Sequence, residues 1–184
     1  MAEVVSSEHI QGVHVVPPDV YPDQRGFFVE TYRREWIPEA SREMVQANRG
    51  DRQSGCIVGL HYHLHQADYW YVPFGTVRVV LHDLREGSPT EGATQQTDLT
   101  GTDHRGIYIP PGVAHGFATL TDATITYLVD SYYNPSDELG VAWNDPEIAA
   151  DWGVDEPTLS KRDQSNPLKP DIPEVDRPRY GLRN

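Results

Sequence analysis

Frequent interruption by turn-forming residues is the feature that most limits what this chain can fold into. Its 184 residues include 15 Pro and 15 Gly. Long helices are excluded, because Pro removes a backbone hydrogen bond from a helix and Gly destabilises the helical backbone. The apolar residues between the interruptions come in short runs rich in β-branched and aromatic side chains. Such runs predict strands and exclude helical bundles and coiled coils.

The predicted strands have the regular spacing that is typical of a β-sandwich or barrel. They lie at residues 13–16, 26–32, 56–61, 69–72, 76–81, 106–109, 116–120 and 123–129. Short helical turns are expected at 41–46 and 145–152, the second with Asp145 as cap before a Pro. We therefore expect one all-β domain over residues 1–184 with short peripheral helices. Its core covers about residues 10–168, and the Pro-containing tail at 169–184 is expected on the surface or disordered.

Charge and cysteine content exclude several classes of protein. The chain has 15 Lys+Arg against 28 Asp+Glu, a net charge of −13, and no basic run. Nucleic acids and anionic membrane surfaces are therefore not expected as partners. The single Cys56 cannot form an internal disulfide, and neither a signal peptide nor a membrane-spanning apolar stretch is evident. These features predict a soluble cytoplasmic protein.

The histidines are the most informative residues for chemistry. His61, His63 and His65 alternate, so on a strand all three would point to one face. His115 follows a Pro-Pro-Gly turn at the start of another predicted strand. Two distant segments that both offer imidazoles indicate one shared interior site. The alternative is that these are scattered surface or hydrogen-bonded structural histidines.

Residues 23–30, Asp-Gln-Arg-Gly-Phe-Phe-Val-Glu, resemble the Asp-x-Arg-Gly-x-Phe-x-Glu signature of dTDP-4-dehydrorhamnose 3,5-epimerases. Further motifs follow in the family's order: Gln46-x-Asn48, 59–62, 83–90, 109–117, Tyr127, 133–135, 143–146 and 159–163. The resemblance covers residues from about 20 to 168. It implies a cupin-type jelly roll, usually a homodimer in which an N-terminal strand crosses to the partner.

The resemblance also implies a reaction and the roles of individual residues. The family inverts C3 and/or C5 of a dTDP-4-keto-6-deoxy sugar through an enolate, without a cofactor. By resemblance His61 is the base, oriented by Asp163, and Tyr127 is the acid on the opposite face of the sugar. The implied substrate-binding residues are Arg25, Phe27, Glu30, Gln46, Asn48 and His115.

Each of these residues also has a plain structural interpretation. Tyr127 would suit a strand as an ordinary aromatic, and Asp163 would suit a helix or turn as a cap. Arg25 could pair with Asp23 on the surface, and Glu30 could be a charged residue of an edge strand. Gln46 and Asn48 are polar residues that a loop accepts without any special reason.

The chain departs from the family pattern at two positions. Val58 stands where the family has Arg, and Asp68 stands where the family has a Lys that stabilises the enolate oxygen. An Asp there would repel the enolate, and such a loss costs about 10²–10³ in rate.

A metal-binding alternative follows from the same departures. His61-x-His63, Asp68 and Gly75 have the spacing of the metal-binding cupin motif, with His115 as the remaining ligand. Three imidazoles and a carboxylate would suit Fe, Mn, Ni, Cu or Zn. His61 would then be a ligand and not a free base, whereas in a metal-free pocket His63 and Asp68 could pair with each other or with His65.

Three functions therefore stay open. The leading one is a nucleotide-sugar epimerase, an isomerase that uses His61, Tyr127 and Asp163 and needs no cofactor. The second is a metal-dependent cupin enzyme, an oxygenase or an isomerase, that holds a divalent ion. The third is a non-catalytic cupin that binds a sugar nucleotide. Retention of all three catalytic residues favours the first.

Overall fold

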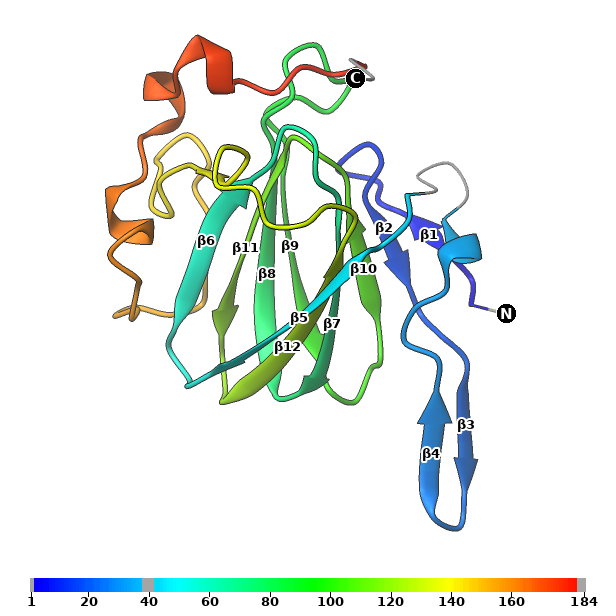
Figure 1. Cartoon of the computed structure of the whole chain (residues 1–184). Helices are drawn as coiled ribbons and strands as arrows, with labels where there is room; N and C mark the ends of the chain where they lie inside the picture. Colours follow the sequence, from blue (N-terminus) through cyan, green and yellow to red (C-terminus); the bar gives the residue numbers. More distant parts are fainter. Residues whose placement is uncertain (1, 38–41, 182–184) are drawn as a thin grey trace.

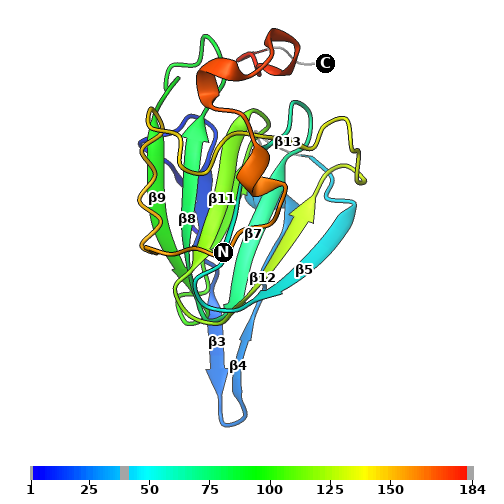
Figure 2. The ribbon, with the colours of Figure 1, turned by 90° about the vertical axis from the view of Figure 1, so that its left-hand side faces the viewer.

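The computed structural model describes residues 2–37 and 42–181, which form two facing β-sheets and a separate hairpin (Figures 1 and 2). All strand pairs within these sheets are antiparallel. The six-stranded sheet has the order β1 (Val5–Ser6), β2 (His14–Val16), β10 (Gly106–Ile109), β7 (Asp68–Phe74), β12 (Ala123–Val129), β5 (Gln46–Arg52). The five-stranded sheet has the order β13 (Leu139–Gly140), β6 (Ile57–Tyr62), β11 (Val113–Thr119), β8 (Thr76–Asp83), β9 (Thr94–Thr100).

The remaining elements are short. Strands β3 (Val20–Asp23) and β4 (Gly26–Val29) form a two-stranded sheet of their own within the described residues. The helices are single 3₁₀ turns: η1 (Arg34–Trp36), η2 (Asp163–Ser165), η3 (Lys169–Asp171) and η4 (Glu174–Asp176). Over the described part of the chain, none of the helices has the length and apolar character needed to cross a membrane. The predicted all-β class and the jelly-roll architecture with short peripheral helices are confirmed.

A closely packed apolar core lies between the two sheets. Val72 of β7 and Ile125 of β12 come from the six-stranded sheet, and Val79 of β8 and Phe117 of β11 come from the five-stranded sheet. Because side chains alternate between the two faces of a strand, every second residue of these strands enters this core. Burial of this apolar surface is the main force that holds the sheets together.

Each of the eight predicted strands overlaps an observed strand, whereas β1, β3, β5, β9 and β13 were not predicted. The helical turn expected at 41–46 is wrong over its described part, because 42–45 are not helical and β5 begins at Gln46. Ser41 lies outside the described residues. Strand β5 lacks apolar alternation because Gln46, Asn48 and Gly50 face a polar cavity. Its sequence therefore carries no hydrophobic signal of a strand.

The second expected turn is present but short. The Asp145 Oδ1 accepts hydrogen bonds from the N–H groups of Glu147 and Ile148 at 2.8 and 3.1 Å, which is the capping role predicted from the sequence. Ala149 then has a φ of +49°, so the helix does not continue towards Trp152.

The C-terminal tail crosses the upper end of the barrel next to the loop that follows β8 (Figure 1, red). Ile172 is buried there against a second apolar cluster that contains Leu60 of β6 and Val80 of β8. The Lys169 N–H donates to Asp145 Oδ2 at 2.7 Å. Of the two expectations for this tail, the surface location holds, and it is ordered by these contacts through the described residues.

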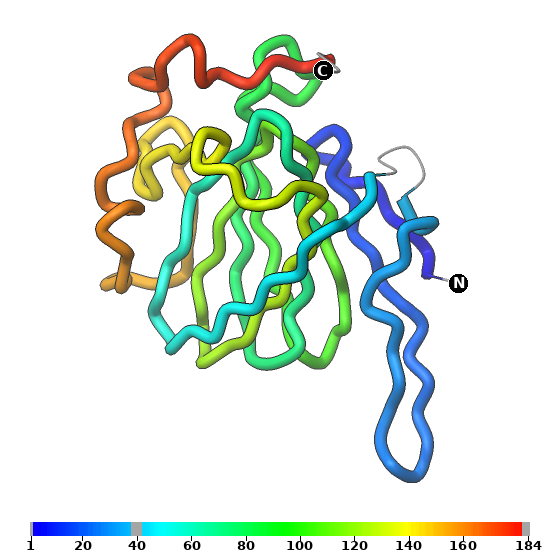
Figure 3. The backbone as a smooth tube through the Cα atoms, in the orientation of Figure 1, coloured from blue at the N-terminus to red at the C-terminus, as the bar shows by residue number. Residues whose placement is uncertain are grey.

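The hairpin of β3 and β4, residues 20–29, projects from the barrel and is called the arm (Figure 3). Tyr21 and Phe28 face each other across it as register partners and are 54% and 64% exposed. Phe27 on the neighbouring position is 59% exposed. Apolar side chains of this size are seldom left in water together, so the arm presents a surface suited to contact with another molecule.

Candidate active site

A cavity of about 370 Å³ opens between the two sheets at one end of the apolar core. Alternation along the strands decides which side chains enter it, because residues two apart on a strand share a face. Strand β5 contributes Gln46, Asn48, Gly50 and Arg52, and the facing sheet contributes His61 and His115. The volume is within the range of small-molecule sites and is lined by polar groups from both sheets.

His61 is held by a buried carboxylate. Its Nε2 donates to Asp163 Oδ1 at 2.6 Å, and the other oxygen, Asp163 Oδ2, accepts from Ser160 Oγ at 2.8 Å. Burial alone would raise the pKa of Asp163, but the hydrogen bonds from His61 and Ser160 and the nearby Arg162 lower it below its ordinary value. The ionised carboxylate fixes the His61 tautomer and leaves Nδ1 as the basic nitrogen.

A local irregularity in β6 aims His61 at the cavity. Val58 and His61, three residues apart, both line the cavity, whereas regular alternation would put them on opposite faces. The register between β6 and β11 shifts between His115 and Phe117, as at a β-bulge. Gly59 has a φ of +117°, and a Cβ there would lie 2.7 Å from the Gly116 Cα. Only glycine fits this close approach of the two strands.

Tyr127 enters the cavity from the opposite wall. It lies on β12 of the six-stranded sheet, whereas His61 lies on β6 of the five-stranded sheet. Burial, with the negative charges of Asp68 and Glu138, raises the pKa of the Tyr127 phenol. The hydroxyl therefore keeps its proton at neutral pH, as a proton donor must.

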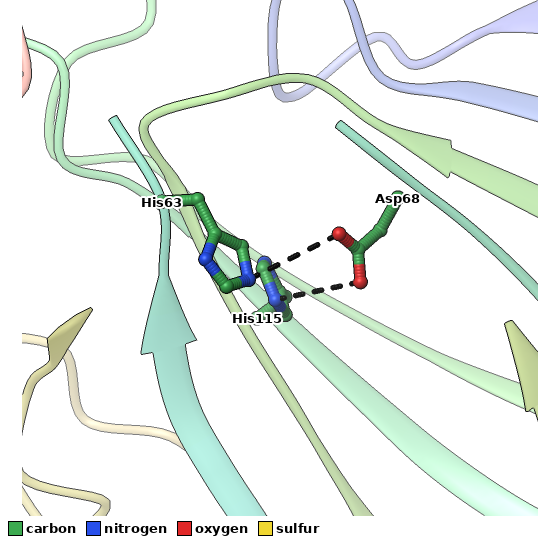
Figure 4. Close-up of side chains that lie close together, drawn as sticks. All are labelled: His63, Asp68 and His115. Atoms are coloured by element: carbon green, nitrogen blue, oxygen red, sulfur yellow. Dashed lines mark ion pairs between the residues drawn. The ribbon is translucent and has the colours of Figure 1, made fainter. Parts of the chain in front are cut away.

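A second group of side chains lines the same cavity (Figure 4). His63, Asp68 and His115 are 5%, 3% and 5% exposed and place one ligand atom each within 4.8 Å of the others. His63 Nε2 is 4.0 Å from Asp68 Oδ1, and His115 Nε2 is 3.9 Å from Asp68 Oδ2. We call these three residues the triad.

The structure separates the four predicted metal ligands and corrects one prediction about the histidines. His63, Asp68 and His115 lie together, whereas His61 is bonded to Asp163 through Nε2 and lies outside the triad. His65 does not share the face of His61 and His63, because β6 ends at Tyr62 and His65 is exposed on the following turn. An aspartate, Asp137, makes this turn by accepting the N–H groups of residues 64–66.

The predicted substrate-binding residues fall into two groups. Gln46, Asn48 and His115 line the cavity. Arg25 and Phe27 lie on the arm and Glu30 directly follows it, so none of these three lines the cavity of its own chain. The Arg25 side chain is 90% exposed and pairs with Asp23, and Glu30 accepts from Arg33.

Sequence reasoning missed several residues of the cavity wall. Arg52 is the single Lys or Arg side chain among the described residues that line it. Val58 lines the same cavity. The departure at Val58 and the presence of an Arg six residues earlier were the available signal. Gln66, Trp70 and Glu138 were also missed, because loop and strand residues of these types carry no signal of their own, and Tyr133 belonged to the motif at 133–135 but was not predicted as a site residue.

A larger, open depression of about 1730 Å³ lies between the N- and C-terminal segments. Four arginines line it, but each is paired with a carboxylate: Arg42 with Asp130, Arg85 with Asp83, Arg177 with Glu86, and Arg179 with Glu86 and Glu174. None of the predicted catalytic residues borders it. We therefore place the candidate chemistry in the smaller cavity.

Comparison with known proteins finds a matching family model, related proteins and solved structures of the same fold. The sequence model of the dTDP-4-dehydrorhamnose 3,5-epimerase family matches residues 7–170. A dTDP-4-dehydrorhamnose 3,5-epimerase of Neisseria gonorrhoeae is 40% identical over 157 residues, 82% of this chain and 48% of that protein. A dTDP-4-dehydrorhamnose 3-epimerase of Streptomyces niveus is 38% identical over 162 residues, 84% of this chain and 78% of that protein.

A solved structure has the same fold. The dTDP-6-deoxy-D-glucose-3,5-epimerase of Legionella pneumophila, in complex with dTDP-4-keto-L-rhamnose, aligns with a TM-score of 0.91 at 33% identity. The alignment covers 98% of this chain and 99% of that one.

Proposed function

This chain belongs to the dTDP-4-dehydrorhamnose 3,5-epimerase family of nucleotide-sugar epimerases, and we propose that it inverts C3, C5 or both in a dTDP-4-keto-6-deoxy sugar. The observation that carries this proposal is the placement of His61 and Tyr127 on opposite walls of one cavity. Inversion of a carbon requires that a proton leave from one face and return to the other. A base and an acid on facing sheets meet that requirement.

The reaction starts with removal of a proton next to the C4 ketone. Such a proton is acidic because the resulting enolate is stabilised by resonance. His61 accepts the proton, and the Asp163 carboxylate stabilises the imidazolium that forms. The Tyr127 hydroxyl then gives a proton to the other face of the same carbon. Both proton transfers use side chains of the cavity, and no redox cofactor takes part in them.

Arg52 is the side chain best placed to hold the anionic part of the substrate in the cavity. It lies on β5 beside Gln46 and Asn48, which are linked by a hydrogen bond of 2.8 Å. A protein with a net charge of −13 repels a diphosphate unless a local cation offsets it. Arg52 supplies such a cation in the cavity that Val58 also lines.

The arm completes the site in a homodimer. Arg25, Phe27 and Glu30 have no role at the cavity of their own chain, and Tyr21 and Phe28 expose an apolar surface. In a two-fold symmetric dimer each arm would lie across the partner, so that these residues reach the partner's cavity and its nucleotide. A cytoplasmic location stays a prediction, in keeping with the free thiol of Cys56.

The test is exchange of solvent deuterium into dTDP-4-keto-6-deoxyglucose in D₂O, followed by NMR. The wild-type protein is expected to introduce deuterium at C3, C5 or both and to invert those carbons. His61→Asn is expected to slow exchange by about 10³, because it removes the base. Tyr127→Phe is expected to keep exchange but lose inversion, because His61 can return a deuteron only to the face from which it took the proton.

Two results would contradict the proposal. One is binding of the nucleotide sugar without any exchange above the enzyme-free control, which would favour a binding protein. The other is inversion at the wild-type rate in Tyr127→Phe, which would remove the opposite-face acid. Circular dichroism spectra of both variants provide the control for folding.

A further inference from the structure

The triad has a hydrogen-bonding arrangement that fixes both of its imidazole rings. His63 Nδ1 donates to the Asp137 carbonyl at 2.6 Å, and His115 Nδ1 donates to the Val113 carbonyl at 2.9 Å. A carbonyl oxygen can only accept, so Nδ1 carries the hydrogen in both rings. In the neutral rings each Nε2 then presents a lone pair, and both Nε2 atoms face Asp68 (Figure 4).

The third member of the triad also presents only acceptor groups. Asp68 Oδ1 accepts a hydrogen bond from Gln66 Nε2, and Asp68 Oδ2 accepts one from Trp70 Nε1, both at 3.0 Å. These two hydrogen bonds fix the orientation of the carboxylate. The distances of 4.0 and 3.9 Å between the imidazole nitrogens and the carboxylate are too long for hydrogen bonds. Three buried acceptors thus converge on one point, and a cation at that point would compensate them.

The spacing and the supporting contacts suit a transition metal. Imidazole nitrogen and carboxylate oxygen bind such ions at about 2.0–2.2 Å, roughly half the distances across the triad. Asp137 and Val113 hold the rings, and Gln66 and Trp70 hold the carboxylate, which is the kind of outer contact that orients metal ligands. Two histidines and one carboxylate leave further coordination positions for the substrate.

We propose that His63, Asp68 and His115 bind one divalent transition-metal ion. This inference rests on the proposed function for its second part, which is that the ion faces the C4 keto oxygen and stabilises the enolate as a Lewis acid. His61 stays outside the ligand set and remains the base, because its Nε2 is bonded to Asp163.

The net charge of the occupied triad explains how it would serve the family reaction. A divalent ion with the Asp68 carboxylate carries a single net positive charge. That is the charge of the Lys that the family has at this position. The replacement of that Lys by Asp would then preserve the electrostatics at the enolate oxygen instead of reversing them.

Metal uptake by the full chain provides the test. Protein freed of metal with a chelator is titrated separately with Zn²⁺, Mn²⁺ and Co²⁺, and metal per chain is measured after desalting by mass spectrometry. About one ion per chain is expected for at least one metal, with Co²⁺ giving the visible bands of a coordinated ion. His63→Ala and Asp68→Asn are each expected to weaken binding more than about 100-fold.

Two matched variants control for general effects. His65→Ala removes the neighbouring exposed histidine, and His61→Asn removes a cavity histidine outside the triad. Both are expected to bind metal as the wild type does, and thermal unfolding confirms that all four variants fold. Failure of the wild type to take up any of the three ions, or equal uptake by the triad variants, would overturn the metal site.

The two parts of the proposal fail separately. One ion per chain without deuterium exchange would support the site and contradict the proposed function. Exchange at the same rate in chelator-treated and metal-loaded protein would overturn the Lewis-acid role, and a rise of about 10²–10³ on loading would support it.

Discussion

The cavity and the arm hold the two groups of residues that resemblance assigned to one site, and they differ in how those residues are fixed. In the cavity, polar side chains are buried and held by hydrogen bonds, as Asp163 holds His61. On the arm, the Arg25 side chain is 90% exposed and pairs with the neighbouring Asp23. A preorganised cavity can direct proton transfer within one chain, whereas the arm gains a defined position only when another surface covers it.

The difference also concerns apolar surface. The cavity borders a core to which strands of both sheets contribute apolar side chains, and this packing stabilises the residues of the cavity. Tyr21 and Phe28 lie against each other, with ring centroids 6.3 Å apart, and remain more than half exposed. Covering such side chains contributes roughly 1.5–3 kcal/mol each. Contact with a second copy would therefore stabilise the arm.

The sharpest prediction separates the two regions by mixing two defective chains. His61→Asn is expected to lower kcat/KM by about 10³, and Arg25→Ala by about 10–100-fold through loss of a charged contact to the diphosphate. In a heterodimer of the two, one cavity would be intact and would receive an intact arm from the partner. Differently tagged, co-expressed chains allow this heterodimer to be isolated.

The purified heterodimer is expected to regain about half of the wild-type kcat/KM, because one of its two sites is complete. If each arm serves its own cavity, every site in the heterodimer carries one lesion. Activity would then stay at the level of the Arg25→Ala chain, and the proposed exchange of arms would be wrong.

Sequence patterns predicted the arm and the cavity unequally well. The motif at 23–30 correctly marked a strand, but nothing in it says whether Arg25 reaches its own cavity or that of a partner. Within the cavity, periodicity predicted β6, β7, β11 and β12 because apolar residues occupy the positions that face the core. It failed for β5, since the inward-facing residues there are polar.

The triad shows the same limit at the level of single residues. The spacing of His63, Asp68 and His115 predicted that they would meet, and they do. Spacing alone also included His61, because residues two apart on a strand share a face. The hydrogen bond to Asp163, a residue 102 positions later, distinguishes His61 from the triad, and such a long-range contact has no signal in periodicity.

A smaller effect is expected when the apolar face of the arm is removed. Replacement of both Tyr21 and Phe28 by Ser should weaken the proposed dimer by at least about two orders of magnitude in Kd, because each of these side chains contributes roughly 1.5–3 kcal/mol when it is covered. Sedimentation velocity over a concentration series measures the change. Val175→Ser, at an 81% exposed apolar residue outside the arm, is the matched control and should leave association unchanged. Equal association in the double variant would exclude the arm as the dimer contact.

The smallest prediction concerns the barrel alone and the pH dependence of its stability. His82 of β8 is fully buried, with Nδ1 2.9 Å from Thr94 Oγ1 and with no hydrogen-bond partner for Nε2 among the described residues. Burial, together with the positive charge of Lys169, lowers the pKa of His82 to about 4. The unfolded chain, with an ordinary histidine pKa of about 6.5, therefore binds a proton that the folded chain does not.

Stability contributed by neutral His82 is complete above about pH 6.5 and declines as the pH falls towards 4. The loss at pH 5.5 relative to pH 7 is about 1 kcal/mol in the free energy of unfolding. Urea unfolding at both pH values should show it, and His82→Gln should reduce it. Burial also lowers the pKa of His115, so part of the decline will persist in that variant. Asp23 of the arm does not titrate in this range, because its hydrogen bonds with Arg25 lower its pKa below the ordinary value. An unchanged pH dependence in His82→Gln, with the exposed His9→Gln as control, would show that His82 can accept a proton without loss of packing.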